Sequence, residues 1–137
     1  MIRVANKSDI NEINVIGKEL YKNFNSIYDL LAYVENDKYL IYVNDEEGIN
    51  GFLIAYENID ECELLCIVVK SECRNQKIGT KLLGYLINRS CNPIFLEVSD
   101  NNKVAIDLYH RFNFQEIGFR KKYYQDGSNA ILMKLVK

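Results

Sequence analysis

Hydrophobic and polar positions follow two periods along this chain, one typical of strands and one typical of helices. The first part predicts one strand, two helices and a β-hairpin, at residues 2–5, from Ser8, from Ser26, and at 39–43 and 51–56. The apolar positions assigned to the two helices are Ile10, Ile13, Val15, Ile16 and Leu20, and then Ile27, Leu30, Leu31 and Val34.

The second part of the chain continues this alternation. A continuously apolar strand at 64–69, which predicts burial on both faces, precedes a polar loop at 70–79 and a helix. The remaining elements are a strand at 94–98, a helix beginning after residues 99–102, and strands at about 115–124 and 130–136. This order predicts an α/β fold with a mixed, mostly antiparallel sheet of about seven strands and about four helices. One strand–helix–strand unit should be parallel and right-handed.

Length and composition narrow the class of protein. The 137 residues fit a single domain over 1–137, and 48% hydrophobic with 26% charged residues is ordinary for a globular chain. A net charge of −2 argues against direct binding of nucleic acid. The N-terminus lacks the pattern of a signal peptide, and no apolar run approaches the ~20 residues of a membrane-spanning helix. We therefore expect a soluble, cytoplasmic protein that does not bind a membrane.

The cysteine and histidine content argues against a metal site. Cys62, Cys66, Cys73 and Cys91 form no C-x-x-C pair, and the single His110 cannot complete a common zinc site. In a reducing cytosol these cysteines are expected to be free thiols, with two of them packed in a strand. No histidine base pairs convincingly with any cysteine, so a cysteine acyl-enzyme is not expected either.

Two places at the carboxyl ends of predicted strands could bind a ligand, since open α/β sheets place ligands there. The first is the loop at 74–80, which leads into a helix whose free N–H groups and dipole favour anions. Gly79 would let a phosphate approach the backbone, and Arg74, Lys77 and Thr80 would add donors. Neither the P-loop nor the dinucleotide-binding pattern is present. An ordinary solvated loop explains the same residues equally well.

The second place is the strand at 94–98, where Glu97 interrupts an apolar run. From spacing alone, a carboxylate pointing into water is the simpler interpretation. Tyr109 lies on the apolar stripe of its helix, where most tyrosines are core residues with a hydrogen-bonded hydroxyl. His110 lies off this stripe, as surface histidines do, and completes no Ser–His–Asp or Cys–His set.

A resemblance to a known family changes this balance. Residues 66–83, CIVVKSECRNQKIGTKLL, resemble the acetyl-coenzyme A segment of the GNAT acetyltransferases, whose pattern is Arg/Gln-x-x-Gly-x-Gly/Ala. The run 96–109, LEVSDNNKVAIDLY, with FNF at 112–114, is similar to the ribosomal-protein-alanine N-acetyltransferases (RimI type). The resemblance is strong over 64–135 and only architectural before that. It implies a GNAT-like fold with helices on both faces of the sheet.

The resemblance also implies roles for individual residues. Acetyl-CoA would be the cosubstrate, with a strand segment beside its pantetheine arm and the following loop around its pyrophosphate. The residues implied for acetyl-CoA binding are Ile67, Val68, Val69, Arg74, Asn75, Gln76, Lys77, Ile78, Gly79, Thr80 and Asn102. Glu97 matches the proposed proton acceptor and Tyr109 the proton donor, and no metal is implied.

Three departures from the family pattern stand out. Lys77 occupies the first glycine position of the loop pattern, so its side chain must point away from the cofactor. Ser128 and Asn129 stand where the relatives tend to have Glu-Asp, and 23–26 reads Asn-Phe-Asn-Ser where they have Pro-Trp. The last two departures leave the acceptor substrate open.

The chemistry of the implied pair favours one kind of acceptor. An amine attacks a thioester only in its neutral form, and a peptide α-amine with a pKa of ~7.8 loses its proton about 3.5 kcal/mol more easily than a lysine at ~10.4. A carboxylate with the ordinary pKa of about 4.3 is a weak base, which suits the α-amine better. A tyrosine with a pKa of ~10 can protonate a departing thiolate of pKa ~8.5 at a cost of about 2 kcal/mol.

The leading prediction is therefore acetylation of a protein N-terminal α-amine, such as the N-terminal alanine of a ribosomal protein. Acetylation of a small amine (a polyamine, an amino acid or a drug) is the alternative. A non-catalytic acyl-CoA-binding module is a third hypothesis, which Glu97 and Tyr109 disfavour. An acidic group could attract a cationic acceptor or could simply be a solvated strand end; it consists of Glu57, Asp60, Glu61 and Glu63. The basic run 120–122 could contact the coenzyme or the ribosome, or could be a solvated edge.

Overall fold

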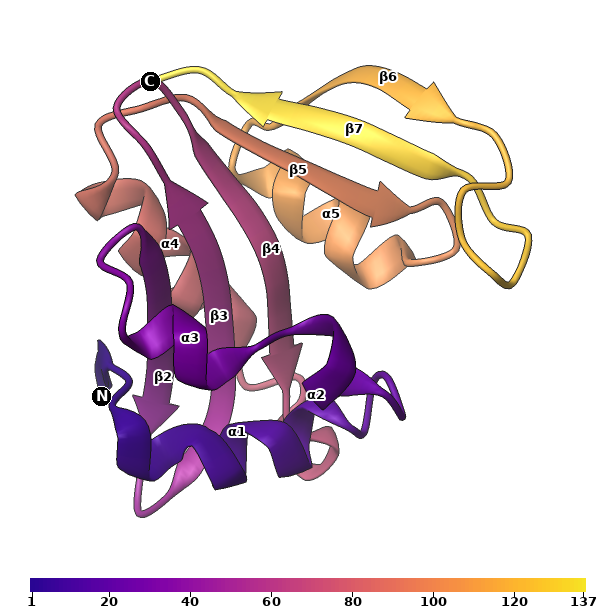
Figure 1. Cartoon of the computed structure of the whole chain (residues 1–137). Coiled ribbons are helices and arrows are strands. Elements are labelled where there is room, and N and C mark those ends of the chain that lie inside the picture. Colours follow the sequence, from indigo (N-terminus) through magenta and orange to yellow (C-terminus); the bar gives the residue numbers. More distant parts are fainter.

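A computed structural model describes residues 1–137 and contains one seven-stranded sheet in the order β1-β2-β3-β4-β5-β7-β6 (Figure 1). The strands are β1 (Ile2–Val4), β2 (Tyr39–Asp45), β3 (Ile49–Glu57), β4 (Cys62–Val69), β5 (Ile94–Ser99), β6 (Gln115–Arg120) and β7 (Ala130–Leu135). The α-helices are α1 (Ile10–Gly17), α2 (Phe24–Ile27), α3 (Leu30–Val34), α4 (Ile78–Arg89) and α5 (Lys103–Arg111), with 3₁₀ turns at Lys7–Asp9 and Ser71–Cys73.

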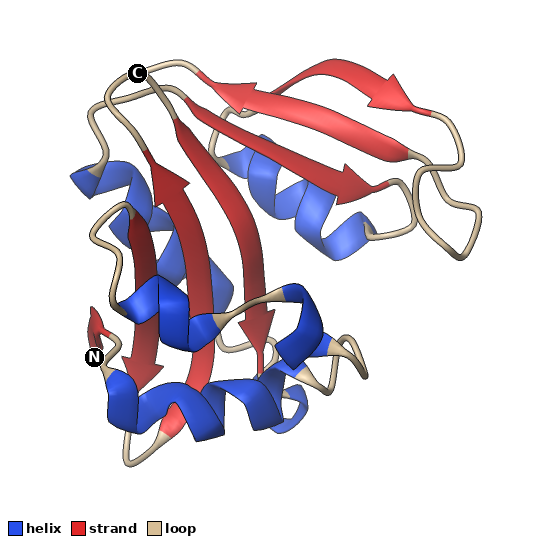
Figure 2. Cartoon of the chain, viewed as in Figure 1, coloured by secondary structure: helices blue, strands red, loops and turns tan.

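The predicted sheet type is confirmed. All neighbouring strands pair antiparallel except β4 and β5, which are parallel and joined through α4. Helices lie on both faces, with α1, α2 and α3 on one side and α4 and α5 on the other (Figure 2). Two separate apolar clusters fill these two layers, and the larger one contains the apolar sides of α4 and α5. No helix combines the length and the apolar character needed to cross a membrane.

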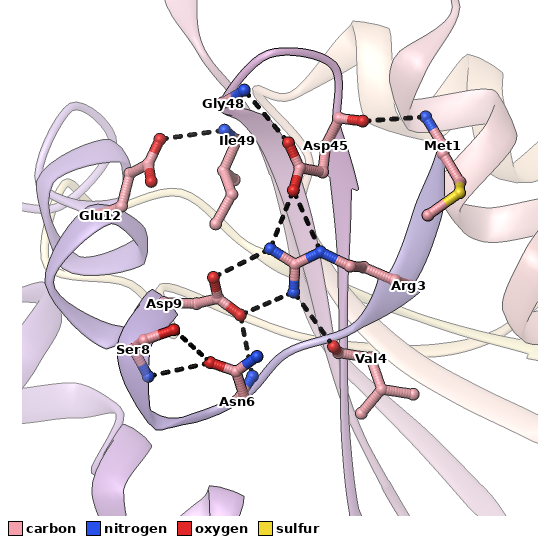
Figure 3. A network of polar contacts seen from close by, with 10 residues as sticks. All are labelled: Met1, Arg3, Val4, Asn6, Ser8, Asp9, Glu12, Asp45, Gly48 and Ile49. Atoms are coloured by element: carbon pink, nitrogen blue, oxygen red, sulfur yellow. Dashed lines mark hydrogen bonds and ion pairs between the residues drawn. The ribbon is translucent and has the colours of Figure 1, made fainter.

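The beginning of the first helix differs from the sequence prediction. Asn6, and not Ser8, caps the N-terminal turn: its side chain accepts a hydrogen bond from the Ser8 N–H at 2.9 Å, while Asp9 accepts from the Asn6 N–H at 2.9 Å. Asp9 is almost fully buried, and its carboxylate is paired with the Arg3 guanidinium by hydrogen bonds of 2.8 and 3.0 Å. Arg3 further donates to Asp45, so one guanidinium ties β1, the first turn and the β2–β3 hairpin together (Figure 3).

The helical region before β2 is more broken than predicted. The first helix stops at Gly17, where a Cβ would lie 2.4 Å from the Phe24 ring, and the predicted helix from Ser26 is replaced by α2 and α3. Tyr28 is extended between these two, and the Asp29 side chain caps α3. Four residues assigned to the buried stripes are instead exposed: Val15, Leu20, Ile27 and Leu31.

Several strand boundaries also differ from the prediction, and two of them have a clear structural cause. The fourth strand begins at Cys62 and not at residue 64. Residues 62–64 belong to it because they pair in parallel with residues 94–96. The sixth strand ends at Arg120, since the chain then turns at Lys122, whose φ of 48° is left-handed. Every residue of β6 is exposed, and the edge strand carries a bulge between Glu116 and Gly118.

The feature that creates the site is the short pairing of β4 with β5. Only three residues of each strand are in register, and the last pair is Leu64 with Leu96. Beyond it the two strands diverge toward their carboxyl ends, which Figure 1 shows as a wedge between the two halves of the sheet. The prediction that residues 64–69 are buried on both faces is therefore wrong at its far end, where Cys66, Ile67 and Val69 are only half-buried.

Candidate functional site

A cleft of about 1020 Å³ opens where β4 and β5 separate, between the start of α4 and the inner side of α5. Its walls come from five segments of the chain. The lining residues are Leu20, Ile67, Val68, Val69, Cys73, Arg74, Asn75, Lys77, Ile78, Gly79, Thr80, Ser99, Asn101, Asn102, Val104, Ala105, Asp107, Leu108, Tyr109 and Arg111. The cleft thus brings together all the residues predicted for acetyl-CoA except Gln76, and it includes Tyr109 but not Glu97.

The start of α4 offers backbone donors to an anion. No side chain caps this helix, so the N–H groups of Ile78, Gly79 and Thr80 have no acceptor on a capping side chain. These groups and the helix dipole favour a phosphate in the adjoining cleft. Lys77 precedes the helix with a φ of 63°, a left-handed conformation that costs a non-glycine residue energy. Glycine would adopt the same conformation at no steric cost.

The wedge also leaves a strand edge available. The side of β4 that faces β5 loses its partner after Leu64, so the backbone groups of residues 65–69 on that side have no β5 strand to bind. Buried or half-buried backbone groups need hydrogen-bond partners. A ligand with a chain of amide groups could therefore form hydrogen bonds with this edge. The pantetheine arm of coenzyme A is such a ligand. Such a ligand would lead from the α4 phosphate site toward Tyr109.

Tyr109 does not behave as an ordinary core tyrosine. Its residue surface is 7% exposed and its ring packs against Phe114, with centroids 5.6 Å apart, yet its hydroxyl makes no hydrogen bond within the chain. The residue lines the cleft, so the hydroxyl is available to a bound group. Burial is the main cause that raises the pKa of Tyr109, followed by the nearby Cys66, Tyr124 and Tyr21. The phenol is therefore protonated throughout the neutral range.

Asn102 caps α5 and also lines the cleft. Its Oδ1 atom accepts a hydrogen bond from the Ala105 N–H at 3.2 Å and so caps α5. This cap fixes the first turn of the helix that carries Tyr109. The residue lines the cleft, and its side-chain amide donates no hydrogen bond within the chain.

Glu97 lies on the other face of the sheet. Its neighbours Leu96 and Val98 are buried against the α4–α5 side, and alternation along β5 turns Glu97 to the opposite side. There its Oε1 atom lies 3.3 Å from Nη2 of Arg120. Glu63 stands on the same face beside Phe95, and partial desolvation, together with the Glu97 carboxylate, raises the pKa of Glu63.

Three further tyrosines lie near β4 or Glu97, and no sequence pattern indicated a role for them. Tyr124, from the loop after β6, is half-buried, and burial followed by the Glu97 carboxylate raises its pKa to about 12. Tyr21, before α2, is near Cys66 and Asp126, which together with burial raise its pKa. Tyr28 donates to the Leu65 carbonyl at 3.4 Å. These tyrosines stand in irregular segments, where periodicity carries no signal.

The remaining sequence predictions concern the histidine, the cysteines and the basic run at 120–122. His110 lies on the surface, where it is 3.4 Å from Glu116. The four cysteines are free thiols, and no cluster of metal-ligating side chains occurs in the chain. Arg120 contacts Glu97 and so is more than a solvated edge, whereas Lys121 and Lys122 are exposed.

Comparisons with known proteins agree with this geometry. Residues 10–114 match the model of the acetyltransferase (GNAT) family. The uncharacterized N-acetyltransferase MJ1530 of Methanocaldococcus jannaschii is 30% identical over 97% of this chain and 89% of its own. The [ribosomal protein bS18]-alanine N-acetyltransferase of Haemophilus ducreyi is 36% identical over 72% of this chain and 74% of its own. The crystal structure of the Escherichia coli ribosomal-protein-S18-alanine N-acetyltransferase superposes with a TM-score of 0.84 and 27% identity, covering 99% of this chain and 92% of that one.

The wedge-shaped sheet, the uncapped α4 and the cleft between them define an acyltransferase with acetyl-CoA as its cosubstrate. The chain belongs to the acetyltransferase (GNAT) family and is similar to the RimI-type enzymes within it. It transfers an acetyl group to an amine.

Proposed function

We propose that this enzyme acetylates the N-terminal α-amine of a peptide or protein, with Glu97 as proton acceptor and Tyr109 as proton donor. The observation that carries the proposal is the position of the two groups on either side of the wedge. Tyr109 faces the cleft that would hold acetyl-CoA, and Glu97 stands on the opposite face, with Tyr124 near both. Acetyl-CoA and the acceptor would thus approach one reaction centre from two sides of the sheet.

The acceptor side suits an amine that loses its proton easily. Glu97 is exposed and paired with Arg120, unlike a carboxylate enclosed in an apolar pocket. A proton acceptor on this open face, acting directly or through a water molecule, would take a proton from an α-amine at much lower cost than from a lysine, because the α-amine has the lower pKa. The amine nitrogen then attacks the thioester carbonyl, forming the C–N bond as the C–S bond breaks.

The leaving-group side suits a neutral phenol. The sulfur takes the electron pair of the broken bond, and the Tyr109 hydroxyl supplies the proton. Burial raises the pKa of this phenol. The same poorly solvated surroundings disfavour a thiolate, so the pKa of the departing thiol rises with it and the transfer stays nearly as favourable as in water. Direct transfer needs no acyl-enzyme.

The known relatives support an N-terminal acceptor. One is named N-alpha-acetyltransferase, from Sulfolobus acidocaldarius, with 29% identity over 96% of this chain and 89% of its own. Others act on the alanine of ribosomal protein bS18, as their names state. We extend the substrate class to this chain, with an N-terminal alanine, such as that of a ribosomal protein, as the first acceptor to test. The cytoplasmic location predicted from the sequence is part of the same proposal.

Thiol release from acetyl-CoA tests the proposal directly. The acceptors are short peptides with N-terminal Ala, Ser or Met, the same peptides with a formylated N-terminus and one internal lysine, and spermidine. We expect the free-terminus peptides to give the highest kcat/KM and the formylated peptides to give almost none. A higher kcat/KM with spermidine would establish the small-amine hypothesis. Tight acetyl-CoA binding without thiol release from any acceptor would establish the binding module.

A further inference from the structure

The loop between β6 and β7 is fastened to the turn that follows β5. Asn129 donates from Nδ2 to Asp100 Oδ2 at 2.9 Å and from its backbone N–H to Asp100 Oδ1 at 3.3 Å. The Asp100 N–H donates in return to the Asn129 carbonyl at 3.0 Å. Asn129 also accepts from the Lys122 N–H at 3.0 Å, which closes the loop on itself. Two residues thus join segments far apart in the sequence by several hydrogen bonds.

A second set of hydrogen bonds lies beside the first. The Ser99 hydroxyl donates to the Ser128 hydroxyl at 2.8 Å, and Ser128 donates to Asp126 at 2.6 Å. Ser128 is 7% exposed, so water does not readily replace these partners. We call Ser99, Asp100, Ser128 and Asn129 the clasp.

The two segments joined by the clasp face different ligands. On one side, Ser99, Asn101 and Asn102 line the cleft that would hold acetyl-CoA. On the other side, the loop follows Arg120, which lies 3.3 Å from Glu97 on the acceptor face. The loop carries Tyr124, which is half-buried and whose N–H donates to the Ser128 carbonyl at 3.3 Å. The clasp is therefore a direct hydrogen-bonded connection between the coenzyme cleft and the loop that supplies a side chain of the acceptor approach.

We propose that the clasp makes acceptor binding depend on acetyl-CoA: the coenzyme fixes the turn at 99–102, and the clasp passes that order to the loop carrying Tyr124. Asp100 and Asn129 are thus positioning residues that touch neither reacting group. This inference rests on the proposed function, because it assumes an acceptor bound beside Glu97. Binding couplings are reciprocal, so a bound acceptor should also tighten acetyl-CoA through the same residues.

A charge exchange within the clasp tests this. Asn129→Asp sets two carboxylates against each other where Asn129 now donates at 2.9 Å, which should release the loop. The double variant Asp100→Asn, Asn129→Asp restores the pair with donor and acceptor exchanged, and the carboxylate introduced at position 129 can still accept from the Lys122 N–H. Asn58→Ala is the matched control, since Asn58 also binds two loop N–H groups but lies in the β3–β4 turn.

Two measurements separate positioning from a general loss of stability. Steady-state kinetics should show the acceptor KM raised about tenfold or more in Asn129→Asp, with kcat and the acetyl-CoA Kd changed less than threefold, and the acceptor KM restored in the double variant. Hydrogen exchange should show that acetyl-CoA slows exchange at residues 74–80 in every variant. At residues 121–129 it should slow exchange only in the parent, the control and the double variant.

The outcomes are distinct. If the parent releases thiol with none of the acceptors, the proposed function fails, while the exchange experiment still reports on the clasp. If acetyl-CoA leaves exchange at 121–129 unchanged in the parent, or if Asn129→Asp keeps the parent's acceptor KM, the clasp is only a structural contact. If the double variant behaves like Asn129→Asp although circular dichroism shows it folded, the Asp100–Asn129 pair does not carry the coupling.

Discussion

Arg120 of β6 reaches across β7 and places Nη2 3.3 Å from Oε1 of Glu97 on β5. The strand between them presents Leu132 opposite Glu97, and Gly118 stands on the far side of Leu132 without a side chain. The bulge in β6 sets this register, so the cation spans three strands on the open face of the sheet. The proposed base is therefore held on the acceptor face, away from the coenzyme cleft.

This separation predicts a specific kinetic result for Glu97→Gln. The variant keeps the shape of the side chain and removes the proton acceptor, so turnover should fall by roughly 10²-fold or more. The acetyl-CoA Kd, measured by calorimetric titration, should stay within about twofold, because Glu97 does not line the cleft. Glu63→Gln is the matched control on the same face, and it should lower turnover less than threefold. Equal losses in both variants would assign the effect to surface charge.

Tyr109→Phe should separate chemistry from stability. The hydroxyl has no hydrogen-bond partner within the chain, so its removal should cost less than the about 0.5–1.5 kcal/mol of an ordinary hydrogen bond. Turnover should nevertheless fall by roughly 10²-fold if this group protonates the leaving sulfur. The loss should shrink with a thioester whose thiol is more acidic. A loss of the same size with both thioesters would contradict the role of Tyr109 as an acid, as would unchanged turnover.

Substitutions at the start of α4 should affect the coenzyme and not the fold. A Cβ on Gly79 would meet only Leu108 at 3.7 Å and Val69 at 3.9 Å, which are ordinary contacts. Gly79→Asp should therefore fold normally but weaken acetyl-CoA by about tenfold or more, because it adds a carboxylate to the wall of the cleft where the phosphate would bind. Gly79→Ala is the control for size. Titration calorimetry and circular dichroism together would refute this if binding were unchanged in a folded Gly79→Asp protein.

Lys77, two residues before Gly79, provides a test in which binding should not change. Lys77 has a φ of 63°, which glycine adopts at no steric cost, although glycine also gains freedom in the unfolded chain. Lys77→Gly should therefore change the free energy of unfolding by less than about 1 kcal/mol and preserve acetyl-CoA binding. Urea denaturation and calorimetry measure both quantities. A tenfold weaker binding would show that the lysine side chain itself contacts the coenzyme.

Cys62 predicts how stability depends on alkaline pH. Burial, followed by the nearby Glu57 carboxylate, raises the pKa of this thiol from 9.0 to about 12. The folded protein thus keeps a proton that the unfolded chain releases, so the free energy of unfolding should fall as pH rises from about 9 toward 12. The slope from this group is about 1.4 kcal/mol per pH unit. Urea denaturation of Cys62→Val should show a shallower fall than the parent. Cys91→Val, at an exposed thiol, is the control, and equal slopes in all three would contradict the prediction.

The pattern of residues along the chain was sufficient to predict the order of the main elements, the parallel unit around α4 and the anion-binding character of the loop before it. These features follow from local physics: the period of apolar residues, turn-forming residues and the anion-binding end of a helix act over a few neighbours. The two runs at 74–80 and 96–109 are also local in sequence, and their residues were sufficient to indicate the family. The broken helices at 24–34 were missed, because their exposed apolar residues mimic a buried stripe.

The face of the sheet that Glu97 and Tyr109 each occupy, and the side chains between them, depend on how distant strands and loops pack in three dimensions. The wedge depends on β4 and β5 parting after Leu64 and Leu96, and no local pattern marks where pairing between distant strands stops. Tyr124 and two residues of the clasp, Asp100 and Asn129, lie in loops whose positions are set by hydrogen bonds across the fold. Residues far apart in the chain meet there only after the sheet has formed, so spacing along the sequence carries no record of their contact.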